Sequence, residues 1–137
     1  MATFISNSPA ETEAFGHEFA KQVRAGSVLA LKGDLGTGKT QFVKGLVAGV
    51  SSSAEVTSPT FTLIHEYLGG CLPIYHFDFF RIEGRRAAAR LGLDDYFFGD
   101  GVSVIEWADK FAELIPEQAE WISFEMKSKT QRVITAK

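Results

Sequence analysis

Positions 33–40 of the chain read GDLGTGKT and match the phosphate-loop pattern G-x-x-x-x-G-K-[ST] in full. Its glycines let the backbone wrap closely around an anion, so that consecutive amides and the N-terminus of the next helix point at a phosphate. Lys39 would reach the β- and γ-phosphates of a nucleotide, and the Thr40 hydroxyl would bind Mg²⁺. The pattern therefore predicts that ATP or ADP contacts Asp34, Leu35, Gly36, Thr37, Gly38, Lys39 and Thr40.

Two acidic residues stand where such a loop needs a partner for its metal ion, at the ends of apolar runs. Asp78 ends the run LPIYHFD, and Glu106 ends the run VSVIE. Both strand ends are expected at the edge of the sheet where open α/β folds place their ligands. We assign Asp78 to the Mg²⁺ ion and Glu106 to the positioning or activation of the attacking water. The reverse assignment, with Glu106 on the metal, stays open.

A hydroxyl-rich segment, TSPT at positions 57–60, lies where nucleotide switches carry a segment that senses the γ-phosphate. A hydroxyl in this segment can bond to the metal or the phosphate only in the triphosphate state. From the pattern alone, a plain turn is an equally good interpretation.

Histidines and arginines elsewhere have simpler interpretations. His65 and His76 alternate with apolar residues and lack a metal-ligand spacing, so hydrogen-bonded strand histidines are the favoured interpretation. A run of arginines is more often a solvated helix face than a site for an acidic partner or RNA, although Arg81 follows Asp78 closely enough to lie near the nucleotide site. This basic cluster comprises Arg81, Arg85, Arg86 and Arg90.

The phosphate loop must be held between a strand and a helix, and the sequence predicts both. The apolar run at 28–31 precedes the loop, and residues 39–50 carry apolar side chains at helical spacing. Farther upstream, a serine, a proline and a glutamate at positions 8, 9 and 11 indicate the start of another helix, which Gly26 would end.

The second half of the chain is dominated by hairpins. Residues 61–68 and 72–80 predict one antiparallel pair, and 120–126 with 132–136 predict another. Between them lie a basic helical stretch at 84–91, a strand at 101–107 and a short helix at 109–116, each expected from its local pattern. We therefore predict one domain over residues 1–137. Its expected fold is a three-layer α/β fold of the P-loop NTPase type, with a mixed parallel and antiparallel sheet and helices on both faces.

Composition narrows the class of protein. The 137 residues include 14 basic and 17 acidic ones, for a formal net charge of -3. A chain of this length can bury its own core, and its one cysteine cannot form an internal disulfide. No apolar run nears the roughly 20 residues that span a bilayer, so we expect a cytoplasmic protein without membrane contact. The acidic balance argues against a protein whose main task is to hold nucleic-acid phosphates by itself.

Several classes of phosphate-loop protein fit these features. Asn7 is the only asparagine, so the guanine-recognition signature N-K-x-D is absent and adenine is favoured. A small-molecule kinase usually needs a lid and an acceptor-binding insertion, for which the chain leaves little room. A nucleotide-sensing interaction module that binds ATP or ADP without meaningful turnover is the other alternative to an ATPase.

Taken together, five motifs make the chain similar to the bacterial TsaE family over nearly its whole length. The motifs are GDLGTGKT at 33–40, SPTFTL at 58–63, YHFDFFR at 75–81, LGLDDYF at 91–97 and IEW at 105–107. The resemblance implies that Thr40 and Asp78 hold Mg²⁺, that Thr60 is a switch residue, and that Glu106 with Trp107 is needed for hydrolysis. The catalytic set is then Lys39, Thr60 and Glu106, with Trp107 at the nucleotide.

The same resemblance implies a partner complex and an indirect role in RNA modification. TsaE-like proteins are the ATPase component of the machinery that makes N6-threonylcarbamoyladenosine in tRNA, and they bind the complex of TsaD and TsaB. ATP hydrolysis would reset that complex between catalytic cycles, and tRNA would be met only through it. Two departures concern the partner side: Ala108 stands where the family commonly has proline, and the stretch at 84–90 is basic where relatives are often acidic. The oligomeric state stays open.

Overall fold

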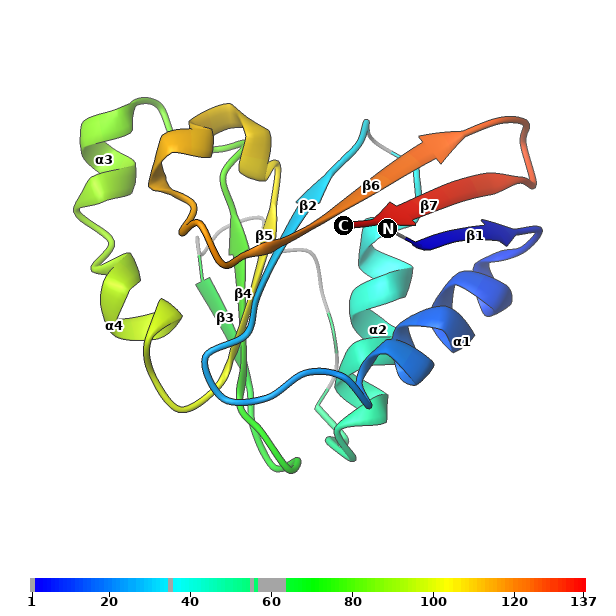
Figure 1. The fold of residues 1–137 in the computed structure, drawn as a ribbon, viewed down its shortest axis with the longest axis horizontal. Helices are drawn as coiled ribbons and strands as arrows, with labels where there is room; N and C mark the ends of the chain where they lie inside the picture. The colour runs from blue at the N-terminus through cyan, green and yellow to red at the C-terminus, as the bar shows by residue number, and fades with distance from the viewer. Residues whose placement is uncertain (1, 35, 55, 57–63) are drawn as a thin grey trace.

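A computed structural model describes residues 2–34, 36–54, 56 and 64–137 of the chain (Figure 1). Over these residues, seven strands form one mixed sheet in the order β1-β7-β6-β2-β5-β4-β3. The strands are β1 (Ala2–Ser6), β2 (Val28–Lys32), β3 (Ile64–Tyr67), β4 (Ile74–Asp78), β5 (Val102–Glu106), β6 (Glu120–Met126) and β7 (Arg132–Ala136).

The centre of the sheet is parallel and its margins are antiparallel. Strand β2 pairs in parallel with β5 and with β6, and β5 pairs in parallel with β4. Strands β3, β7 and β1 extend this centre through antiparallel pairs. The described parts of both predicted hairpins are therefore confirmed, and the carboxyl ends of β2, β5 and β4 meet at one edge of the sheet.

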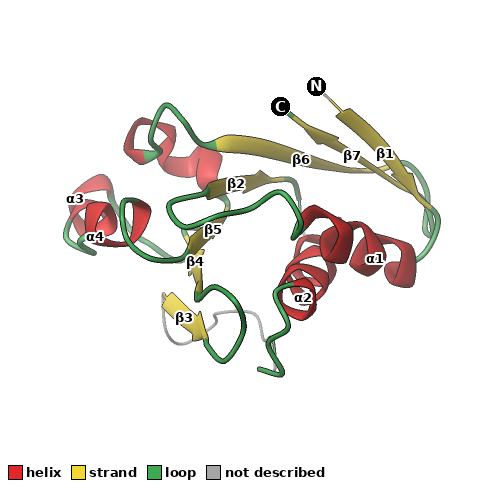
Figure 2. Cartoon of the chain, turned by 60° about the horizontal axis from the view of Figure 1, so that its bottom comes forward, coloured by secondary structure: helices red, strands yellow, loops and turns green. Residues whose placement is uncertain are grey.

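Helices cover both faces, which confirms the predicted three-layer α/β architecture (Figure 2). Helices α1 and α2 pack on one face around a core that includes Phe19, Phe42 and Leu46. The other face carries α3, α4 and a 3-10 helix, η1, around Phe77 and Phe97. Their bounds are α1 (Pro9–Phe19), α2 (Lys39–Gly49), α3 (Arg85–Ala89), α4 (Leu93–Phe97) and η1 (Ala108–Leu114).

The structure differs from the sequence analysis at one expected boundary and contains two elements that the sequence analysis did not predict. The first helix ends at Phe19 rather than at Gly26, because the chain must turn back before β2; Gly26 makes that turn with a φ of 89°. Strand β1 had no strong pattern in the sequence and forms by pairing with β7, at the far end of the chain. Helix α4 is only five residues long, and such a short helix has too little periodicity to be read from the sequence.

Helices α1 and α2 approach so closely that glycine is required at their crossing. A side chain at Gly45 of α2 would overlap the carbonyl oxygen of Glu13 in α1, and one at Gly16 of α1 would overlap the carbonyl oxygen of Phe42 in α2. The close contact fixes where the first turn of α2 lies relative to the N-terminus of α1. Both ends belong to the cavity described below.

Gly45→Ala should therefore destabilise the fold although alanine is the better helix former. The gain in helix propensity is about 1 kcal/mol, but the added methyl group meets backbone rather than a movable side chain. We expect the free energy of unfolding to fall by about 1–3 kcal/mol in urea titrations. Gly84→Ala is the control, because nothing lies within 4 Å of a side chain added there. Equal stability of the two variants would contradict the close packing.

Candidate functional site

The phosphate loop joins the end of β2 to the start of α2, as predicted. Gly33, Gly36 and Gly38 have φ angles of 149°, 79° and 98°, which favour glycine over other residues. Gly38 is the N-cap of α2, and the Thr37 hydroxyl donates to the carbonyl oxygen of Asp34 at 2.7 Å. The free amides of the first turn of α2 are thereby held at the edge of the sheet, where they can bind an anion.

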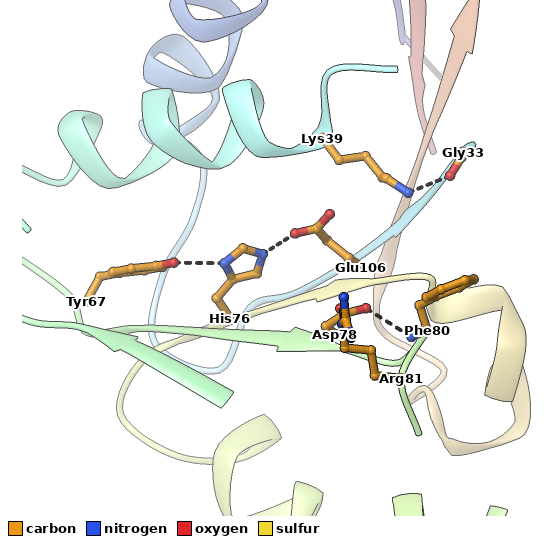
Figure 3. Close-up of polar contacts among 8 residues, drawn as sticks. All are labelled: Gly33, Lys39, Tyr67, His76, Asp78, Phe80, Arg81 and Glu106. Carbon is orange, nitrogen blue, oxygen red and sulfur yellow. Dashed lines mark hydrogen bonds and ion pairs between the residues drawn. The ribbon is translucent and has the colours of Figure 1, made fainter. Parts of the chain in front are cut away.

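The Lys39 ammonium lies inside this loop, and Lys39 is only 5% exposed. Its Nζ donates to the Gly33 carbonyl oxygen at 2.5 Å and lies 4.1 Å from the ring centroid of Trp107 (Figure 3). Burial lowers the pKa of Lys39, and the nearby carboxylates of Glu106, Asp109, Asp78 and Asp34 oppose that shift. In this arrangement the Lys39 ammonium contacts a carbonyl group of the loop and the Trp107 ring. The same ammonium could instead contact a phosphate.

Asp78 and Glu106 lie side by side because β4 and β5 pair in parallel and place the two residues in register. The Asp78 carboxylate accepts a hydrogen bond from the Phe80 amide at 3.0 Å, and Arg81 Nε lies 3.9 Å from its other oxygen (Figure 3). Burial is the main cause that raises the pKa of Asp78, and the neighbouring Glu106 carboxylate adds to the shift. This carboxyl group is thus oriented but poorly solvated.

Glu106 has a different set of neighbours. Its Oε2 lies 2.5 Å from His76 Nε2, and His76 Nδ1 lies 3.0 Å from the Tyr67 hydroxyl (Figure 3). Trp107 follows at a φ of 58°, the left-handed region that few non-glycine residues adopt, and begins the turn into η1. Such conformations cluster at functional sites, because the surrounding structure must hold them.

One cavity of about 440 Å³ connects these groups. Its walls come from the phosphate loop, the ends of β4 and β5, the N-terminus of α1 and the turn between β6 and β7. The residues that line it are Ser8, Pro9, Thr12, Gly36, Gly38, Lys39, Thr40, Gln41, Asp78, Phe80, Arg81, Glu106, Trp107, Lys129, Thr130 and Arg132. The cavity thus brings together a helix N-terminus, a lysine and two carboxylates, which are groups that phosphate-loop proteins use around a nucleotide.

Comparison with known proteins identifies the family. The family model described as "Threonylcarbamoyl adenosine biosynthesis protein TsaE" matches residues 6–134. The chain belongs to the TsaE family. It is 43% identical to the tRNA threonylcarbamoyladenosine biosynthesis protein TsaE of Bacillus subtilis, over 93% of this chain and 80% of that protein. For the TsaE of Treponema pallidum the identity is 38%, over 96% of each chain.

A solved structure supports the same fold. The crystal structure of Bacillus subtilis YdiB superposes with a TM-score of 0.83 and 38% sequence identity, covering 98% of this chain and 83% of that one. The predicted family resemblance and the fold class are therefore confirmed. Among the described residues, no helix is long and apolar enough to cross a membrane.

In this TsaE-family chain the structure brings most of the predicted site residues together. The lining of the cavity includes seven of them: Gly36, Gly38, Lys39, Thr40, Asp78, Glu106 and Trp107. Asp34 and Thr37 line a second hollow, which shares Trp107 with the cavity. Leu35, Thr60 and the rest of the TSPT segment lie outside the described residues.

Sequence reasoning missed one side of the cavity. Arg132 Nε donates to the Gly36 carbonyl oxygen at 3.1 Å, and its guanidinium also bonds to the Ser128 carbonyl oxygen at 2.8 Å. The turn between β6 and β7 is thereby tied to the phosphate loop, 96 positions earlier in the chain. No local pattern marks a contact of that range. Of the basic cluster, Arg81 lines the cavity, whereas Arg85 pairs with Glu113 at 3.2 Å.

The oxygen donors present fit Mg²⁺. Thr40 and Asp78 both line the cavity, and the Asp78 carboxylate is fixed by a backbone amide. The described residues contain no group of three or more His, Cys, Asp and Glu side chains that could hold a metal alone. Magnesium commonly takes one or two protein oxygens and completes its octahedron with water and phosphate. Thr40 and Asp78 could supply such a share, and Glu106 lies beside Asp78 on the neighbouring strand.

Burial of Asp78 predicts a pH-dependent loss of stability in the ligand-free protein. With its pKa raised on folding, this carboxyl holds its proton in the folded chain after the unfolded chain has lost it. Stability is therefore lost as the pH rises above about 4, until the folded pKa is passed. Because an asparagine amide carries no proton to lose, Asp78→Asn should become more stable relative to the wild type as the pH rises above about 4, until the folded pKa of Asp78 is passed.

Urea unfolding of both proteins across that pH range tests this expectation. Glu117→Gln serves as a control, since it removes an exposed carboxylate that water solvates in both states. A stability difference between wild type and Asp78→Asn that stays constant, or that shrinks with rising pH, would show that burial does not dominate at Asp78.

Proposed function

We propose that the chain is the Mg²⁺-dependent ATP-binding and ATP-hydrolysing component of the machinery that forms N6-threonylcarbamoyladenosine in tRNA. The observation that carries the proposal is the cavity that joins Lys39 and Thr40 at the start of α2 to Asp78 and Glu106 at adjacent strand ends. The tRNA role rests on membership of the TsaE family and on the names of its relatives.

ATP would bind with its phosphates in the loop. The amides of the loop and of the first turn of α2 donate to phosphate oxygens, and Lys39 exchanges the Gly33 carbonyl for the β- and γ-phosphates. The remaining wall of the cavity leaves room for ribose and base. It is formed by the N-terminus of α1 and the turn between β6 and β7, including Ser8, Pro9, Thr12, Lys129 and Thr130.

For hydrolysis, Glu106 would accept a hydrogen bond from the attacking water and aim it at the γ-phosphate. Mg²⁺, held by Thr40 and Asp78, would supply charge neutralisation at the phosphates. Trp107 would pack beside the nucleotide, since it lines the same cavity and already contacts Lys39. Thr60 would act as a switch residue, as the resemblance to the TsaE family implies.

The arginines of the cavity are the reason to expect slow ATP hydrolysis in the isolated chain. The guanidinium of Arg132 is already engaged by backbone carbonyl groups, and Arg81 is 53% exposed beside Asp78. Phosphoryl transfer gains a factor of about 10³–10⁵ when a further arginine reaches the transition state. We propose that TsaB and TsaD supply or order the missing groups, and that hydrolysis in turn resets their complex. Contact with tRNA would then be indirect.

Phosphate release tests the proposed function. The isolated chain should hydrolyse ATP slowly in the presence of Mg²⁺, and addition of TsaB and TsaD should raise the rate.

Lys39→Ala should keep the fold. It should lose most ATP affinity in calorimetry, because a methyl group replaces the ammonium that would contact the phosphates. Lys44→Ala, which changes an exposed lysine on the same helix, is the control. Tight ATP binding without phosphate release, alone and with the partners, would instead indicate a nucleotide-sensing module.

Substitutions of Asp78 and of Glu106 should have different effects on ATP binding and on turnover. Asp78→Asn should weaken the dependence of ATP affinity on Mg²⁺, because an amide lacks the charge that holds the ion. Glu106→Gln should leave ATP affinity within about twofold and reduce turnover by at least about 10²-fold, because an amide is a poor proton acceptor. Calorimetry with and without Mg²⁺, beside phosphate-release assays, separates the two effects. If Glu106→Gln abolishes metal-dependent binding and Asp78→Asn does not, the assignments are reversed.

A further inference from the structure

His76 sits in the middle of a buried chain of side chains that spans three strands. It lies on β4 and is 0% exposed, with Tyr67 of β3 on one side and Glu106 of β5 on the other (Figure 3). Tyr67 is 3% exposed and Glu106 6% exposed. Polar atoms so far from water need defined partners, and each ring nitrogen of His76 has one.

The partners determine which ring nitrogen carries the proton. An ionised carboxylate can only accept, so His76 Nε2 must donate to Glu106 Oε2. In the tautomer that carries its proton on Nε2, Nδ1 is an acceptor, and the Tyr67 hydroxyl 3.0 Å away can donate to it. In that tautomer the hydrogen bonds run in one direction, from Tyr67 through His76 to Glu106.

This chain constrains a side chain that would otherwise be mobile. A glutamate has three rotatable bonds, and the carboxylate of Glu106 lies at the end of a strand beside a cavity. The bond from His76 fixes Oε2, and in Figure 3 the second carboxylate oxygen points away from His76. A carboxylate held by one oxygen can present the other to water in a constant direction, which is what the alignment of a nucleophile requires.

We propose that His76 is a positioning residue for hydrolysis, which acts by holding the Glu106 carboxylate in the orientation that aligns the attacking water, with Tyr67 fixing the imidazole ring. The inference rests on the proposed ATPase function. It also distinguishes the two carboxylates: the Asp78 carboxylate is held by a backbone amide, whereas the Glu106 carboxylate is held by a side chain that can itself be replaced.

Two substitutions separate the two hydrogen bonds of His76. In His76→Gln the side-chain amide reaches the position of Nε2, so the donor to Glu106 is kept. In His76→Asn the amide reaches only the position of Nδ1, so the bond to Glu106 is lost while a partner for Tyr67 remains. We expect His76→Asn to lower kcat by about 10- to 100-fold with KM and ATP affinity within about twofold, and His76→Gln to retain most of the activity.

A double-mutant cycle with Glu106→Gln tests whether His76 acts through Glu106. In that background His76→Asn should cause less than about a twofold further loss of kcat, because the group that it positions is already disabled. Losses that multiply in the double variant would overturn the proposal. A fall in Mg²⁺-dependent ATP affinity with kcat unchanged would also overturn it, since Glu106 would then serve the metal.

Nuclear magnetic resonance of the ligand-free protein labelled with ¹⁵N-histidine gives a readout that does not depend on turnover. A slowly exchanging Nε2 proton should be visible for His76, should be absent in His76→Asn and should shift in Glu106→Gln. A signal that does not respond to Glu106→Gln would contradict the contact. Failure of the proposed function is distinct: a wild-type chain that releases no phosphate, alone or with TsaB and TsaD, overturns the ATPase, whereas normal turnover with multiplying losses overturns only the role of His76.

Discussion

Burial of ionisable groups at the carboxyl edge of a parallel sheet is the constraint on which this protein depends. Lys39, Asp78 and Glu106 are each less than a tenth exposed, although water would stabilise the charged form of each side chain. The fold compensates with a separate partner for each one. A loop carbonyl and the Trp107 ring hold the lysine, a backbone amide holds the aspartate, and a histidine holds the glutamate.

The rest of the molecule keeps these partners in place. Parallel pairing of β4 and β5 sets Asp78 beside Glu106, and the tight crossing of α1 and α2 fixes the helix start beneath the phosphate loop. Aromatic packing supports both faces, with Phe42 in contact with Phe124 on one and Phe77 in contact with Phe97 on the other. Such cores supply the stability that a poorly solvated, conformationally strained site removes.

Features formed by neighbouring residues in the chain could be predicted from the sequence, whereas contacts between distant residues could not. The phosphate loop is contiguous, and the strands that end in Asp78 and Glu106 are short apolar runs, so each could be recognised from its immediate neighbours in the chain. The hydrogen bond from His76 to Glu106 joins residues 30 positions apart, and the bond from Arg132 to Gly36 joins residues 96 positions apart. Strand β1 likewise forms only through its pairing with β7. Contacts of that kind depend on the order of strands in the sheet, which a periodicity does not encode.

The roles of these residues are tested most directly by a crystal structure of the chain with Mg²⁺ and an ATP analogue that cannot be hydrolysed. We expect phosphates in the loop within hydrogen-bond distance of Lys39, the metal bound to Thr40 and Asp78, and Glu106 still bonded to His76 while it faces a water near the γ-phosphate. An analogue bound away from the loop, or a metal bound to Glu106 with that bond broken, would contradict these roles.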